Sequence, residues 1–516
     1  MKRDFLKWTI MVGVTVLIAS AVGARETNEI ERLQRELREL REKMQSLEEK
    51  LNYAATNTTS PAPLEANRPT PASAPATPAK VWSPSDPLRV GRGGVYADLG
   101  LVGTFAVGGS TAKDIEGGTQ LGGHDPNQNG FTVQGVEMNL QGAVDPYLRG
   151  NANLLFSVDS GGESFLELEE AWLETVTLPG DLQVRAGQLL SAFGRVNTQH
   201  PHTWGFVDAP LVNGRFLGAD GLRNPGVRLS WLAPTPFYSE LVLGIQDSHG
   251  ETAAGFRSDG HTHAGTVGDQ LPFGYRHAEN DRGVRHVTDL LFTPRYVVSF
   301  DLTDEQTLVL GASGAFGPNA SGSRGDTVTQ IYGVDLYWKW KPARAHAGFP
   351  FVSFQAEALV RRYQLGEFDW DEQGNGGDAD GDGFVDAGCL TEATGLTPAV
   401  LARETVTDYG AYAQLLYGFR RGWVGGLRLD YVAGERAAYE RAGLLLADGT
   451  GGGTPLGRDP HRDARWRLSP NLTWYPTEFS KFRLQYNYDD RRARGRDHSV
   501  WLQFEFLLGA HAAHQF

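Results

Sequence analysis

Apolar and polar residues alternate along the greater part of the chain. In the segment 480–489, for example, Phe482 and Leu484 alternate with Arg483 and Gln485. A period of two residues is typical of a β-strand with one apolar and one polar face. Such alternation occurs in soluble β-sandwiches as well as in membrane barrels, so it predicts strands without deciding between these architectures.

Sixteen segments carry this pattern, and the connections between them differ in length in a regular way. The predicted strands cover 96–107, 131–144, 149–158, 164–175, 182–193, 226–233, 237–246, 293–301, 306–315, 329–340, 351–363, 408–419, 422–433, 465–475, 480–489 and 498–508. Short connections follow even-numbered strands, at 145–147, 178–180, 234–236, 420–421 and 476–478. Most connections after odd-numbered strands are long, at 108–130, 194–225, 247–292, 364–407 and 434–464, with a short exception at 159–163.

This parity decides between the two architectures. Outer-membrane barrels have short periplasmic turns and long external loops, whereas a sandwich gives no reason for such a rule. We therefore predict an all-β fold: a 16-stranded antiparallel transmembrane β-barrel over residues 93–516, preceded by a short N-terminal coiled-coil helix.

The first 92 residues show three other patterns. Residues 1–24 combine basic residues, an apolar stretch and small residues, which predicts a secretory signal peptide, with an uncleaved membrane anchor as the alternative. Residues 25–54 predict a periplasmic coiled coil that self-associates, most simply as a trimer, through a heptad seam of Ile30, Leu33, Leu37, Leu40, Met44, Leu47 and Leu51. Residues 55–92 are rich in Pro, Ala and Thr and predict an extended linker.

Composition and charge exclude several classes of protein. The chain of 516 residues has one Cys and a formal net charge of −14. An acidic chain lacks the basic face that phosphate groups require, so we expect no nucleic-acid partner. No apolar stretch of about 18 residues follows the first 20, which argues against a helical membrane protein. Because common hydrolase and phosphate-loop motifs are absent, we predict that the protein is not an enzyme.

Several segments resemble bacterial outer-membrane porins. The terminal Phe516, after an alternating last strand, is similar to the assembly signal of these barrels, and 184–195 resembles the phosphate-selective porin O/P group. The segment 200–208 and the ending 509–514 look like barrels labelled zinc-regulated outer-membrane receptors. The resemblance implies an outer-membrane location, contact with membrane lipid and lipopolysaccharide, and insertion by the barrel-assembly machinery. It also implies a homotrimer whose third external loop, 194–225, folds into the lumen.

An acidic segment matches a calcium-binding loop. Oxygen ligands at alternate positions would come from Asp378, Asp380, Asp382, the carbonyl of Phe384 and Asp386. A glycine at the sixth position permits the sharp turn, but the twelfth position holds Cys389 in place of the usual glutamate. The segment predicts a structural calcium ion, with a solvated acidic loop as the alternative.

Histidines gather in two neighbouring long loops. His200 and His202 lie in the third external loop, and His261 and His263 lie in the next long one. Imidazole is a ligand for zinc, copper and nickel. We regard these four residues as candidate ligands of zinc or another transition metal, with polar loop histidines that bind no metal as the alternative.

Charged residues on the polar faces are candidates for lining a pore. They are Glu167, Glu169, Arg185, Arg195, Asp208, Arg215 and Arg223. Carboxylates on a channel wall favour cations, so the acidic strand 164–175 predicts cation preference, which arginines at the narrowest point would reverse. The alternative for these residues is a set of salt bridges within the wall.

Two functions fit these patterns. The first is an outer-membrane porin that forms a passive diffusion channel for small polar or ionic solutes. The alternative is an outer-membrane barrel that binds metal or tethers the envelope and has no open channel.

Overall fold

The computed structural model describes residues 88–92, 95–258, 272–276, 283–322, 324–370, 396–447, 453–492 and 494–509. Within these ranges, no helix has the length and apolar character needed to cross a membrane. The predicted signal peptide, coiled coil and calcium loop lie outside the described residues, and so do His261 and His263. Self-association through 25–54 therefore stays a prediction.

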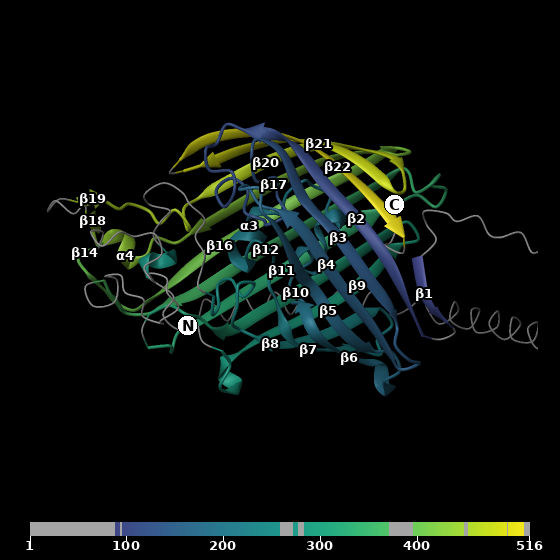
Figure 1. Ribbon diagram of the computed structural model, residues 1–516, viewed down its shortest axis with the longest axis horizontal. Helices are drawn as coiled ribbons and strands as arrows, with labels where there is room; N and C mark the ends of the chain where they lie inside the picture. Colours follow the sequence, from purple (N-terminus) through teal and green to yellow (C-terminus); the bar gives the residue numbers. More distant parts are fainter. Residues whose placement is uncertain are drawn as a thin grey trace, which may run out of the picture. The chain divides into compact units, whose positions relative to one another are not determined.

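Sixteen of the described strands form one closed antiparallel sheet, which confirms the predicted barrel (Figure 1). The first eight are β2 (Val95–Ser110), β3 (Gly130–Ala143), β4 (Leu148–Val158), β5 (Ser164–Thr175), β6 (Leu182–Leu190), β7 (Arg223–Leu232), β8 (Tyr238–Asp247) and β9 (Leu290–Thr303). The last eight are β10 (Gln306–Pro318), β11 (Val328–Trp340), β12 (Phe351–Leu365), β16 (Glu404–Arg420), β17 (Trp423–Gly434), β20 (Arg465–Thr477), β21 (Ser480–Arg491) and β22 (Gly495–Gly509). Each strand pairs with the next, and β22 pairs with β2 to close the barrel.

A short additional strand lies at the point of closure. β1 (Leu88–Arg92) falls at the end of the predicted linker and pairs with residues 95–99 of β2. β22 pairs with residues 100–110 of β2, and β3 pairs along the other edge. β1 therefore covers the stretch of edge that β22 leaves unpaired, and exposed strand edges are prone to pairing with other chains.

The barrel wall has an apolar outer face and a polar inner face. On β21, Phe482 and Leu484 are exposed on the outside, whereas Arg483 and Gln485 are buried inside. β17 and β22 repeat this alternation along their length. An outward apolar band around a polar interior is the arrangement of membrane-spanning β-barrels.

One strand departs from simple alternation. In the pairing of β5 with β4, Glu170 lies opposite Asn153 and Leu168 lies opposite Leu154, so that Glu169 is an extra residue in a β-bulge. A bulge of this kind reverses the parity of the residues that follow. Glu169 and Glu170 are both buried as a result.

The reversal corrects the orientation expected for Trp172. Strict alternation places this side chain toward lipid, but its ring lies 3.6 Å beneath the guanidinium of Arg185. Glu174, two residues further on, is fully buried and pairs with Arg149 and Arg185. A single bulge accounts for both placements.

The connections carry short elements of their own. They are η1 (Pro179–Asp181), η4 (Phe273–Tyr275), η5 (Val287–Asp289), α4 (Ala438–Arg441), β13 (Phe368–Asp369), β14 (Leu396–Thr397), β15 (Val400–Leu401), β18 (Leu445–Ala447) and β19 (Gly453–Pro455). β13 pairs with β15, and β14, β18 and β19 form a three-stranded sheet. A buried cluster that includes Tyr275, Trp370 and Tyr439 packs together the three connections β8–β9, β12–β16 and β17–β20.

Candidate functional site

The connection between β6 and β7 enters the barrel. We call residues 191–222 the inserted segment; it contains η2 (Val196–Thr198), η3 (Pro201–Thr203) and α3 (Leu211–Leu217). α3 lies within the ring of strands and contacts β12, β16 and β17 (Figure 1). The porin resemblance implied an inserted loop here, with bounds a few residues later in the chain.

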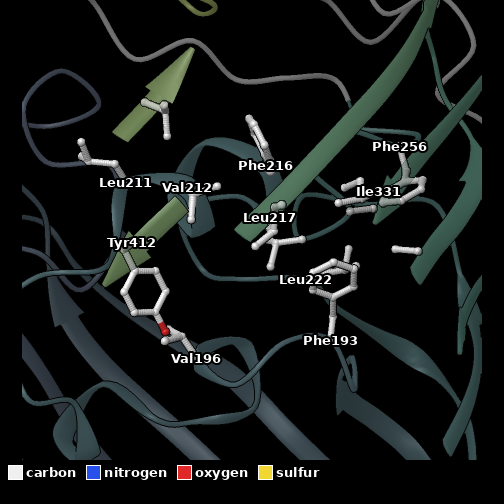
Figure 2. Packing of buried hydrophobic residues seen from close by; sticks show 14 of the residues in the cluster. Phe193, Val196, Leu211, Val212, Phe216, Leu217, Leu222, Phe256, Ile331 and Tyr412 are labelled. Carbon is white, nitrogen blue, oxygen red and sulfur yellow. The ribbon is translucent and has the colours of Figure 1, made fainter. Parts of the chain in front are cut away.

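An apolar cluster holds the two ends of the inserted segment. Phe193, Leu211, Phe216 and Leu217 are all fully buried (Figure 2). Their partners on six strands of the wall are Leu291, Ala315, Ile331, Leu359, Tyr412 and Val432. Burying side chains of this size stabilises a fold by about 1.5–3 kcal/mol each. The inner face is thus apolar where it meets the two ends of the segment, and these ends are packed against it.

An ion network holds the middle of the segment to another part of the wall. The carboxylate of Asp208 accepts hydrogen bonds from Arg428 at 2.5 Å and from Arg467 at 2.8 Å. Gln485 and Asn487 donate two more, at 2.9 and 2.8 Å. Although burial alone would raise the pKa of Asp208, the attraction of Arg428 and Arg467 lowers this pKa to about 2. Asp208 is therefore ionised at neutral pH.

A third contact fixes the backbone where the segment begins. The amides of Arg195 and Val196 each donate a hydrogen bond of 2.8 Å to Oε1 of Glu357 on β12. The preceding Gly194 has a φ of 56°, and a Cβ at this position would collide with the same carboxylate. Only glycine, which has no Cβ, can adopt this positive φ and leave room for the carboxylate without strain.

The segment also meets an acidic part of the wall. Nδ1 of His200 lies 3.4 Å from Oε1 of Glu137 and 3.4 Å from Oε2 of Glu169. Nε2 of the same ring lies 3.2 Å from Oε2 of Glu170. Nδ1 of His202 lies 3.0 Å from Oε2 of Glu137. Two histidines of the segment therefore contact three carboxylates, contributed by β3 and by the bulge of β5.

A third histidine reaches this cluster from the connection between β2 and β3. Nε2 of His124 lies 3.4 Å from Oε1 of Glu169. Burial alone would lower the pKa of His200, but its attraction to Glu137 and its contacts with Glu169 and Glu170 outweigh burial and raise this pKa well above the usual value. The cluster thus holds a positive charge among its carboxylates.

A cavity of about 400 Å³ lies beside the inserted segment, toward the short turns of the barrel. Residues 195–210 line one side, and β11, β12, β16 and β17 line the other. Its charged lining residues are Arg195, Asp208, Lys339 and Arg428. Because Asp208 and Arg428 pair with each other, the remaining charges at the cavity are both positive.

The structure separates the predicted pore-lining residues into two groups. Arg195 and Asp208 line the cavity, and Arg195 lies 3.8 Å above the ring of Tyr337. Arg215 instead donates a hydrogen bond of 2.8 Å to the carbonyl of Asp463. The other predicted residues sit in ion pairs: Glu167 with Arg223, Arg185 with Glu174, and Glu169 with His124 and His200.

Sequence reasoning missed several residues of this site. Glu137, His124 and Glu357 contact the segment or its partners, yet each lies in a separate part of the sequence. A signal was present for part of it: two adjacent glutamates, Glu169 and Glu170, cannot both face inward in a regular strand. The pair pointed to a bulge at a polar site.

The solved structures that match this chain include outer-membrane channels. The channel DcaP of Acinetobacter baumannii matches with a TM-score of 0.45 and 12% identity, over 80% of this chain and 97% of that one. An anion-selective porin from Comamonas acidovorans matches with a TM-score of 0.42 and 8% identity, over 80% and 99%. OprB of Pseudomonas putida gives a TM-score of 0.41 and 12% identity, over 80% and 94%. TM-scores below 0.5 carry no argument of their own, and the barrel is established by its strand pairing.

Sequence comparison gives one clear relationship. No family model matches the chain. A protein of Aquifex aeolicus (strain VF5), named as an uncharacterized protein, is 30% identical over 418 residues, which cover 77% of this chain and 73% of the relative. The narrower resemblances to phosphate-selective porins and to zinc-regulated receptors stay predictions. The chain belongs to the same family as the Aquifex aeolicus protein.

Proposed function

We propose that the protein is an outer-membrane channel through which small polar or ionic solutes diffuse, narrowed by the inserted segment. The observation that carries this proposal is the wall: side chains on the outside are apolar, and the inside is lined with charged and amide groups. A soluble barrel of this kind would expose a large apolar surface to water. The cavity beside the segment gives solutes an aqueous space on the short-turn side.

The charges at this cavity favour anions. Arg195 and Lys339 line it, and neither forms an ion pair with a described residue. The glutamates that predicted cation preference are held in ion pairs by Arg223, His124 and His200. Unpaired charges at a narrow point set ion selectivity. We therefore propose anion preference in place of the cation preference drawn from the sequence.

Planar-bilayer recordings of the purified full chain test the channel. We expect discrete conductance steps in potassium chloride. A folded preparation that inserts but gives no steps would contradict the proposal. It would favour the second candidate, a closed barrel, because the inserted segment contacts β3, β5, β12, β17, β20 and β21.

Reversal potentials under a potassium chloride gradient test the selectivity. We expect a potential of the sign given by chloride preference. Lys339→Gln and Arg195→Gln should each move it toward zero, because each removes one positive charge from the cavity. Lys113→Gln, at an exposed position of the connection between β2 and β3, is the matched control and should leave it unchanged. Cation preference in the unaltered chain would show that Arg195 and Lys339 do not set the ion selectivity.

A further inference from the structure

We propose that Glu137, Glu169 and His200 bind a divalent transition-metal ion of the zinc type, which joins the inserted segment to the barrel wall. One oxygen of each carboxylate and one ring nitrogen lie within 4.8 Å of one another. Glu137 comes from β3, Glu169 from the bulge of β5, and His200 from the residue before η3. The inference goes beyond the channel function and does not depend on it.

The distances fit a metal better than direct hydrogen bonds. Nδ1 of His200 is 3.4 Å from one oxygen of Glu137 and 3.4 Å from one oxygen of Glu169. Charge-assisted N–H···O bonds are shorter, about 2.7–2.9 Å. Ligand atoms about 2.0–2.2 Å from a tetrahedral Zn²⁺ lie about 3.3–3.6 Å apart. The two contacts of His200 fall in the second range.

A buried carboxylate oxygen of Glu169 gives a second argument for a bound metal. Oε2 of Glu169 is buried and accepts no hydrogen bond among the described residues. The whole side chain is only 5% exposed, and this is the oxygen that faces His200. Its ion-pair contact with His200, at 3.4 Å, is longer than a charge-assisted hydrogen bond of about 2.7–2.9 Å, so this oxygen has no close partner among the described residues. A metal between His200 and Glu169 would satisfy this atom.

The surroundings orient the three ligands. Nε2 of His200 lies 2.7 Å from Nδ2 of Asn153 and 3.2 Å from Oε2 of Glu170, and these two contacts hold the ring with Nδ1 toward Glu137 and Glu169. His202 contacts the second oxygen of Glu137 at 3.0 Å, and His124 contacts the second oxygen of Glu169 at 3.4 Å. Partners that hold the far side of a ligand are the usual outer shell of a metal site.

The donor set selects the class of metal. One imidazole and two carboxylates suit Zn²⁺ and its first-row neighbours, whereas Ca²⁺ takes six to eight oxygen ligands. Zn²⁺ would also compensate the two buried carboxylates. In the metal-free state, a proton on His200 supplies the compensating positive charge, and metal binding would displace this proton.

Metal content of the full chain in detergent micelles tests the site. The protein is stripped with a chelator, supplied with Zn²⁺ alone, desalted and analysed for zinc per chain. We expect Glu169→Gln and His200→Gln to bind one equivalent less than the unaltered chain. Exposed Glu163→Gln and His346→Gln are the matched controls and should keep the full content. Comparing variants cancels zinc held elsewhere on the chain.

Further measurements distinguish loss of the metal site from a general effect of the substitutions on folding. His202→Gln leaves the three ligands in place, so it should weaken zinc binding by roughly 10- to 100-fold in competition with a coloured chelator, as loss of an outer-shell partner does. Co²⁺ should give the visible absorption of a tetrahedral site in the unaltered chain and not in His200→Gln. Circular dichroism shows whether each variant is folded. Equal zinc content in the folded unaltered chain, Glu169→Gln and His200→Gln would overturn the site and leave only the protonated histidine.

Discussion

Asp208→Asn should release the middle of the inserted segment from the wall. The aspartate is fully buried, and its carboxylate is shared by Arg428, Arg467, Gln485 and Asn487. Removing its charge leaves Arg428 and Arg467 with one carboxylate each, Asp430 and Asp489, in place of two, and breaking a buried ion pair from one side costs about 3–5 kcal/mol. That free energy corresponds to roughly 150- to 5,000-fold faster amide hydrogen exchange in the segment, if exchange follows local opening.

Hydrogen exchange followed by mass spectrometry on peptides from 204–210 measures this effect. Asp304→Asn, in an exposed turn between β9 and β10, removes the same charge without a buried partner and should change nothing. The same Asp208→Asn protein should show a larger or less steady unit conductance, since the segment narrows the channel. Unchanged exchange in 204–210 would mean that the ion network does not hold the segment.

Phe216→Ala should destabilise the barrel itself. The ring is fully buried in the apolar cluster, whose wall residues come from β9, β10, β11, β12, β16 and β17. The guanidinium of Arg361 lies 4.9 Å from its centre. Truncating a buried phenylalanine to alanine costs about 3–5 kcal/mol, because contacts are lost and a cavity remains. We expect the free energy of unfolding to fall by this amount.

Reversible denaturation in detergent micelles, followed by tryptophan fluorescence, measures this loss. Phe131→Ala is the control, because Phe131 is 76% exposed on the outer face and fills no packed space. An equal loss of stability in both variants would show that the packing of α3 contributes nothing specific.

The barrel could be predicted because its signal is local and repeated. Each strand presents alternate residues to lipid and to the interior, as Leu484 and Gln485 do, and this alternation appears directly in the sequence. The lengths of the connections then distinguish a membrane barrel from a sandwich. The same local rule fails at Glu169, where a bulge adds a residue and reverses the orientation of Trp172.

The site could be predicted only in part, because its residues are brought together by the connection between β6 and β7, which folds into the barrel. His200 and His202 were singled out by their chemistry, but their partner Glu137 lies on another strand far earlier in the sequence. No spacing rule relates them, since their distance depends on how 191–222 crosses the lumen. The anchoring of this segment by Asp208 also depends on strands near the other end of the chain.

Cysteine modification during recording tests most directly whether ions pass through the barrel beside the inserted segment. Gln414 lines the cavity, whereas the next residue, Leu415, is 43% exposed on the outer face. Gln414→Cys and Leu415→Cys are made in a Cys389→Ser chain, so that each carries one thiol, and a negatively charged thiol reagent is added to the bilayer chamber. We expect a fall in unit conductance for Gln414→Cys and none for Leu415→Cys. Full labelling of Gln414→Cys without any change in conductance would contradict an ion path beside the inserted segment.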